Sequence, residues 1–188
     1  MLPERLTIGP NWLVPLAAFA LLVPGLAFHR MGQYRLNEVF GITMLSVITF
    51  GLTWSLGLLI AGLLGKRLLP EELLRSAVAL WISNILVFAS WYWRLDAGGP
   101  YGRASAARHV KSAFLFPQMM VPGDSKFCDP GWKPEFVDYL FLAFNTSTAF
   151  SPTDVPVLGR WAKVLMMIQS SISLASIAIL AARAINIL

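Results

Sequence analysis

The residues best suited to chemistry form one short polar run between two apolar segments in the last third of the chain. The run consists of Asn145, Thr146, Thr148, Ser151, Pro152, Thr153 and Asp154. Their side-chain and backbone oxygens can coordinate cations or bind water. Within a bilayer, irregular backbone persists only where protein buries it or water lines it. The run therefore predicts either the constriction of a water-filled pore or a packed turn between two helices.

The apolar segment that precedes this run, residues 135–150, is too short to cross a bilayer, because a spanning helix needs about 20 apolar residues. It is apolar nearly all round, so it lacks the charged face of a helix that lies on the membrane surface. A long apolar segment follows at residues 156–187. This order predicts a re-entrant half-helix, a polar break and a final spanning helix.

The composition is that of an integral membrane protein. Only 13% of the 188 residues are charged and 56% are hydrophobic, whereas a typical soluble domain has about 25% charged residues. The net charge of +5 comes from cations that cluster in loops rather than along one helix face. This pattern favours contact with membrane lipids over nucleic-acid binding. We predict one membrane domain over residues 1–188, in the cell (plasma or inner) membrane.

Three further apolar segments are long enough to cross a membrane. With the last one, they predict an all-α membrane protein with four transmembrane helices and a re-entrant half-helix. The predicted spans are residues 11–28, 37–65, 73–93 and 156–187. We expect the first span to be retained, because prolines interrupt it and no small-residue cleavage site follows. Residues 95–132 predict a long polar connection.

Two amide side chains, Asn84 and Gln169, lie inside predicted spans. An amide at membrane depth must find a hydrogen-bond partner and so tends to face the interior of a helix bundle. Contact between helices is one interpretation of both residues, and a place along a pore is the other.

Signatures of catalysis are absent from the sequence. His29 and His109 are far apart and show no zinc-site spacing. No span contains paired carboxylates, and no nucleophile elbow, phosphate loop or dinucleotide fingerprint occurs. We therefore predict that the protein is not an enzyme and binds neither a metal nor a cofactor.

The polar run has a specific resemblance. Thr146-Ser147-Thr148-Ala149-Phe150-Ser151-Pro152-Thr153-Asp154 resembles the pore-loop signature of potassium channels. In that family, a threonine-rich end of the pore helix leads into a glycine-containing filter and an Asp. The resemblance makes residues 73–93 the outer helix, residues 136–144 the pore helix, residues 156–160 a short turn and residues 164–187 the inner helix. It also implies a tetramer. It covers about residues 73–188 and is specific only over residues 138–160.

The centre of the motif departs from the potassium-channel pattern. Ser151 and Thr153 replace the filter glycines, and Pro152 replaces the aromatic residue. Glycine permits the backbone that turns successive carbonyls inward, whereas proline has a fixed φ and serine and threonine resist positive φ. A standard potassium filter is therefore not expected. A pore of different selectivity could use the oxygens of Thr146, Thr148, Ser151 and Thr153.

The chain also resembles a group of uncharacterised bacterial membrane proteins. Their C-terminal half carries a similar pattern of Asp-Tyr/Phe-Leu, Phe-Thr, Ser/Thr-Asp-Val and Arg. Membership in that group implies no established activity.

Local helix chemistry offers another interpretation of the carboxylates beside the half-helix. Asp138 lies in the first turn of that helix, where a negative charge is favourable. Asp154 and Thr153 could cap a last helix that begins near Pro156.

Together these patterns predict a channel-like membrane protein, an oligomeric cation-conducting pore with a non-standard filter. Two alternatives stay open: a non-conducting module that binds lipid or a partner protein, and a small-solute transporter. The membrane orientation is open as well. The 15 cations divide into five and ten on the two sides. The positive-inside rule places the larger set in the cytoplasm, and the channel resemblance implies the reverse.

Overall fold

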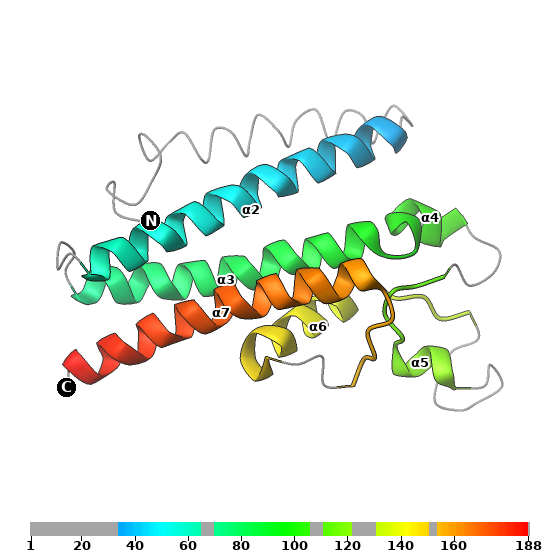
Figure 1. Cartoon of the computed structure of the whole chain (residues 1–188). Coiled ribbons are helices and arrows are strands. Elements are labelled where there is room, and N and C mark those ends of the chain that lie inside the picture. Colours follow the sequence, from blue (N-terminus) through cyan, green and yellow to red (C-terminus); the bar gives the residue numbers. More distant parts are fainter. Residues whose placement is uncertain (1–33, 65–69, 106–110, 122–130, 151–153, 188) are drawn as a thin grey trace. The chain divides into compact units, whose positions relative to one another are not determined.

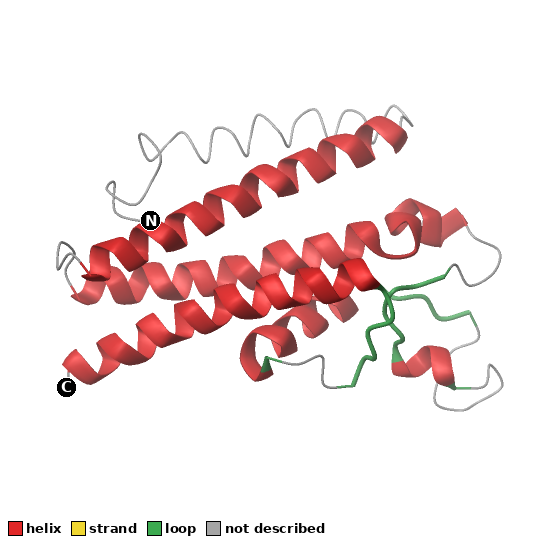
Figure 2. Cartoon of the chain, viewed as in Figure 1, coloured by secondary structure: helices red, strands yellow, loops and turns green. Residues whose placement is uncertain are grey.

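The structure is a computed structural model that describes residues 34–64, 70–105, 111–121, 131–150 and 154–187. These residues are helical apart from connecting loops and one isolated β-bridge, as predicted for an all-α protein (Figure 2). In chain order, the elements are α2 (Tyr34–Leu64), α3 (Pro70–Leu95), η2 (Asp96–Gly98), α4 (Gly99–Ser105), α5 (Pro117–Met120), α6 (Phe136–Ala149) and α7 (Arg160–Ile187) (Figure 1).

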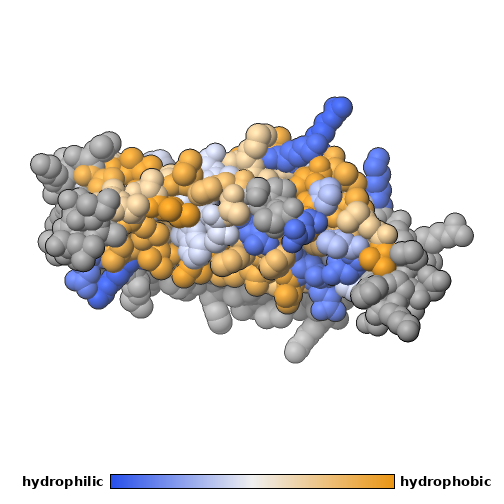
Figure 3. Space-filling view, turned by 90° about the horizontal axis from the view of Figure 1, so that it is seen from below, coloured by the Kyte–Doolittle hydropathy of each residue, from blue (hydrophilic) through white to orange (hydrophobic). Residues whose placement is uncertain are grey.

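Three helical stretches are long and apolar enough to cross a membrane: Leu36–Leu63, Glu71–Arg103 and Arg160–Ala182. They coincide with three of the four predicted spans. The predicted span at residues 11–28 lies outside the residues that the structure describes. Hydrophobic residues also cover much of the coloured surface in Figure 3. The protein therefore has the character of a membrane protein.

The chain separates into two compact units. The first contains residues 1–84 and 172–188, and the second contains residues 85–171. α3 and α7 each contribute residues to both units. A single membrane domain over residues 1–188 stays a prediction.

Hydroxyl groups on α2, in the first unit, are satisfied within their own helix. Each donates to the carbonyl four residues earlier, over 2.7 to 2.9 Å; the donors are Thr43, Ser46, Thr49 and Thr53. This bonding allows polar residues to lie in apolar surroundings without unsatisfied hydroxyl protons. Leu59 and Leu73 are fully buried in this unit.

The core of the second unit is built around Phe114, a fully buried residue of the predicted polar connection. Its ring packs edge-on against three other aromatic rings, with centroids 5.2 to 6.1 Å apart, in the geometry that aromatic pairs prefer. These partners are Tyr92 from α3, Tyr139 from α6 and Trp161 from α7. The connection thus contributes its own core residue to the unit.

The last helix begins at Arg160, so the predicted start near Pro156 is wrong. The residues before it are extended and pair with the connection through an isolated bridge between Phe114 and Val157. Leu115 N donates to Pro156 O at 3.0 Å, and Leu158 N donates to the carbonyl of Ala113 at 2.7 Å. Because this pairing uses their backbone groups, these residues do not join the helix. We call the pairing of residues 113–115 with residues 156–158 the 114–157 junction.

α6 lies close to the predicted half-helix at residues 135–150. Its 14 residues correspond to about 21 Å at 1.5 Å per residue, less than the roughly 30 Å hydrocarbon core. The Asp138 carboxylate accepts a hydrogen bond from Glu135 N at 2.7 Å, so it acts as the first-turn acid that the sequence predicts. The residue after the helix, Phe150, has a left-handed φ of 56°, as in a common type of helix C-cap.

Candidate functional site

The position of α6 is set by two buried polar clusters, both within the second unit. The first surrounds Asp96, which is fully buried directly after α3. One carboxylate oxygen accepts the hydroxyls of Ser112 at 2.6 Å and Tyr139 at 2.7 Å, and the other accepts the N–H of Ala113 at 2.7 Å. Three donors satisfy a carboxylate that would otherwise be costly to bury. With Arg103, these residues form the Asp96 cluster.

Arg103 supplies the opposite charge in this cluster and is 6% exposed. Its guanidinium donates to the backbone carbonyls of Trp93 at 2.9 Å and Asp96 at 2.7 Å. The guanidinium carbon lies 5.1 Å from the centroid of the Tyr139 ring, a cation–π distance. Lys133 in turn donates to the carbonyl of Arg103 at 2.7 Å. The cluster therefore joins the end of α3, α4 and the first turns of α6.

Tyr139 keeps its proton in this environment. Burial, followed by the nearby Asp96 carboxylate, raises the pKa of the Tyr139 hydroxyl well above its ordinary value. The hydroxyl is thus a permanent donor to Asp96 at neutral pH.

A tight turn brings Asp96 into place. Ala97, Gly98 and Gly99 have φ values of 51°, 76° and 74°, so three successive residues are left-handed. A Cβ on Gly99 would lie 2.9 Å from the carbonyl oxygen of Arg94, which makes glycine necessary there. The chain therefore reverses directly after α3.

The second cluster surrounds Gln169, which is fully buried in α7. Its carbonyl oxygen accepts the hydroxyl of Tyr92 at 2.5 Å. Its amide nitrogen donates to the carbonyl of Ala143 at 2.7 Å and to the hydroxyl of Ser147 at 2.8 Å. This Gln169 cluster joins α3, α6 and α7 and gives the amide the partners that an apolar segment requires.

The predicted constriction residues on α6 have different environments. Thr146 is 1% exposed, and its hydroxyl donates to the carbonyl of Leu142 at 2.8 Å. Thr148 is exposed, and its hydroxyl bonds to the carbonyls of Phe144 and Asn145. Thr148 and the half-buried Asn145 thus remain at the surface of the last turn, whereas Thr146 does not.

The other predicted site residues are more widely separated. Ser151, Pro152 and Thr153 lie outside the described residues. Asp154 is exposed in a turn six residues before α7, so the predicted capping of the last helix by this residue is wrong. Asn84 is fully buried in the first unit, away in sequence from α6. The structure therefore groups Asn145, Thr146 and Thr148 on one helix end.

Sequence reasoning missed the members of the Asp96 cluster, because they lie in the predicted polar connection or in an apolar helix. One signal was present: an acid that lies three residues after the aromatic run Trp91-Tyr92-Trp93 and two residues before a glycine pair. Within the described ranges, no three His, Cys, Asp or Glu residues are grouped as metal ligands would be.

Comparisons with protein-family models, curated proteins and solved structures found no match for this chain. The resemblance to potassium channels and to the bacterial membrane-protein group stays an interpretation of the sequence pattern.

Proposed function

We propose that the protein is a channel-like membrane protein, in which α6 is a re-entrant half-helix and the residues after it line a cation-conducting constriction. One observation carries this proposal. The 114–157 junction pairs the chain before α6 with the chain after it, through backbone hydrogen bonds of 2.7 and 3.0 Å. A helix too short to span, with its two flanks held together, fits a segment that enters a membrane and leaves on the same side.

The exposed face of α6 supports a position inside a membrane. Val137, Phe141 and Phe144 follow one another at helical spacing and are 68%, 55% and 46% exposed. The opposite face is buried against its own unit. An apolar face of this kind suits lipid or a neighbouring copy of the chain, as a homo-oligomeric pore requires.

The proposed mechanism uses the end of α6. The C-terminus of a helix carries about half a negative charge, which favours a cation beyond Phe150. The Thr148 hydroxyl donates its proton to backbone, so its oxygen lone pairs stay available to a cation or to water. In an oligomer, the C-terminal ends of α6 from several subunits would surround one axis. Asp154 would add negative charge near this axis.

A non-conducting module is the second candidate, and the Gln169 cluster favours it. The polar groups of Ser147 and Gln169 bond to each other, and the Thr146 hydroxyl bonds to its own helix. These contacts serve packing and leave fewer oxygens for a pore.

Ion flux into liposomes tests the proposal. The purified full chain is reconstituted, its insertion is verified, and K⁺, Na⁺ and Cl⁻ fluxes are measured at acid, neutral and alkaline pH. We expect cation flux that Thr148→Val lowers several-fold. Thr43→Val is the matched control, because Thr43 is also exposed and bonds to the carbonyl four residues earlier. Absence of flux for every ion would contradict the proposal.

A further inference from the structure

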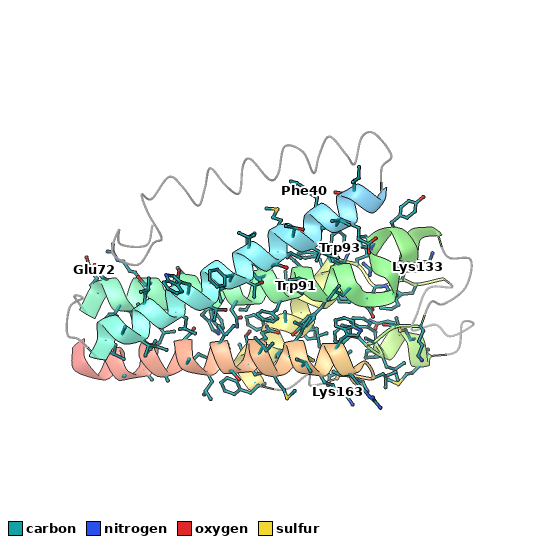
Figure 4. The ribbon with its side chains drawn as sticks, turned by 45° about the horizontal axis from the view of Figure 1, so that its top comes forward. Phe40, Glu72, Trp91, Trp93, Lys133 and Lys163 are labelled. Atoms are coloured by element: carbon teal, nitrogen blue, oxygen red, sulfur yellow. The ribbon has the colours of Figure 1, made fainter. Side chains whose placement is uncertain are left out.

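The first turns of α7 carry an exposed stripe with cations at its beginning and apolar side chains after them. Arg160 and Lys163 are exposed. Val164, Met167 and Ile168 are 50%, 62% and 43% exposed. Steps of one, three or four residues place all five on one side of the helix. We call this surface the α7 stripe, and Figure 4 shows Lys163 on the outer side of α7.

The beginning of the stripe lies at the level of an aromatic belt. Leu158 N donates to the carbonyl of Ala113, and Ala113 N donates to Asp96, directly after α3. The last turns of α3 carry Trp91 and Trp93 (Figure 4). Tryptophans mark the headgroup level of a membrane, and Trp161 is 37% exposed in the first turn of α7. The two cations therefore lie where lipid phosphates would be.

The apolar part of the stripe runs from this level into the hydrocarbon. Arg160 and Ile168 are eight residues apart on α7, which is about 12 Å along a helix. One leaflet of the hydrocarbon core is about 15 Å thick, half of the whole. The stripe thus has the length and polarity of one phospholipid, from its headgroup to most of an acyl chain.

Among the residues that the structure describes, no acid forms an ion pair with either cation, Arg160 or Lys163. The first turn of α7 contains no acid. Cations at a helix N-terminus also face the positive end of the helix dipole, which is unfavourable. An external anion would pair with the two cations and would also offset their unfavourable interaction with the helix dipole. Because the apolar side chains continue the surface, a lipid phosphate fits better than a free anion.

From these observations we infer that the α7 stripe is a binding site for an anionic phospholipid. Arg160 and Lys163 hold the headgroup, and Val164, Met167 and Ile168 contact an acyl chain. The site is independent of ion conduction, since it uses none of the residues assigned to the constriction.

Lipid titration of the full chain tests this site. The protein in neutral detergent is titrated with dioleoylphosphatidylglycerol or dioleoylphosphatidylcholine, and the thermal unfolding midpoint gives an apparent Kd for each lipid. We expect tighter binding of the anionic lipid. Arg160→Gln and Lys163→Gln should each weaken it about fivefold, the contribution of one cation at an anionic membrane surface.

Arg75→Gln is the matched control. Arg75 is an exposed cation in an early turn of α3, but it pairs with Glu71 at 2.6 Å, so its loss should leave the apparent Kd unchanged. Three results would overturn the inference: equal affinity for the two lipids, unchanged affinity in both α7 variants, or an equal loss in the Arg75 variant.

Discussion

At the scale of single residues, Asp96 and Gln169 show how this chain places strongly polar groups in an apolar unit. Each is fully buried, and each is surrounded by hydrogen-bond partners from other segments of the unit. Buried polar groups are tolerated only when they are satisfied in this way. The same hydrogen bonds hold α6 in its position, so a shift of α6 would leave Asp96 and Gln169 buried without some of their partners.

Asp96→Asn should destabilise the protein strongly. The variant removes the carboxylate charge and places an amide donor opposite either the hydroxyls of Ser112 and Tyr139 or the N–H of Ala113. A buried donor left without an acceptor costs about 1–3 kcal/mol, and more where a charged group is involved. Thermal and denaturant unfolding in detergent measure the loss. Asp154→Asn is the control, since that carboxylate is exposed and surface substitutions change stability by about 0.5 kcal/mol or less. Equal stability of the two variants would contradict the role of Asp96.

Stability should also fall in alkaline solution because of Tyr139. The folded-state pKa of this hydroxyl is raised by burial and by Asp96, whereas the unfolded chain has a tyrosine pKa of about 10. The unfolded state therefore loses the proton first. The stabilisation is complete below about pH 10 and declines above it, by at most about 1.4 kcal/mol per pH unit.

Unfolding midpoints measured across this alkaline range check the prediction. Tyr139→Phe cannot lose a proton at this position, so its midpoint should fall less steeply than that of the wild-type chain. Parallel curves for the two proteins would show that Tyr139 does not titrate between the folded and unfolded states.

At the scale of elements, local sequence pattern predicted α6 and the long helices well, but it misplaced the start of α7. The apolar periodicity and the first-turn acid at Asp138 are local signals, and α6 lies within one residue of the predicted ends. The residues before Arg160 include a proline and apolar side chains, which also suit a helix start. Their backbone instead pairs with residues 113–115, a contact distant in sequence that no local pattern reveals.

The Asp96 cluster was unpredictable for the same reason. Its carboxylate, hydroxyls and cation come from residues 96, 103, 112 and 139. Only the fold brings them together. A polar residue in a predicted connection gives no sign that the connection returns to cover the unit's core.

Gly159→Ala should weaken the 114–157 junction. An added Cβ would lie 2.5 Å from the Cβ of Ala113, closer than real contacts allow, so the two segments would have to separate. Overpacking of this kind costs about 1–3 kcal/mol. Unfolding midpoints provide the measurement. Gly57→Ala is the control, because an added Cβ meets nothing within 4 Å and alanine favours a helix by up to about 1 kcal/mol. An unchanged unfolding midpoint in Gly159→Ala would show that the two segments can separate without loss of stability.

At the scale of the whole molecule, composition was the most reliable guide. The low charge content predicted a membrane protein, and three stretches of the described chain are long and apolar enough to span. Function was harder to predict, because the polar run at residues 145–154 has the same composition in a pore and in a packed turn. In the structure, Ser147 is bonded within the Gln169 cluster and Thr148 is exposed at the surface.

The central claim is that α6 enters and leaves the membrane on one side, and labelling of its two flanks tests it most directly. After Cys128 is replaced by serine, single cysteines are introduced at Met120 or Leu158, which are 55% and 58% exposed. A membrane-impermeant maleimide is then applied to oriented vesicles. We predict that both positions are labelled from the same face of the vesicle. Labelling of the two positions from opposite faces would show that α6 crosses the membrane and would contradict the account.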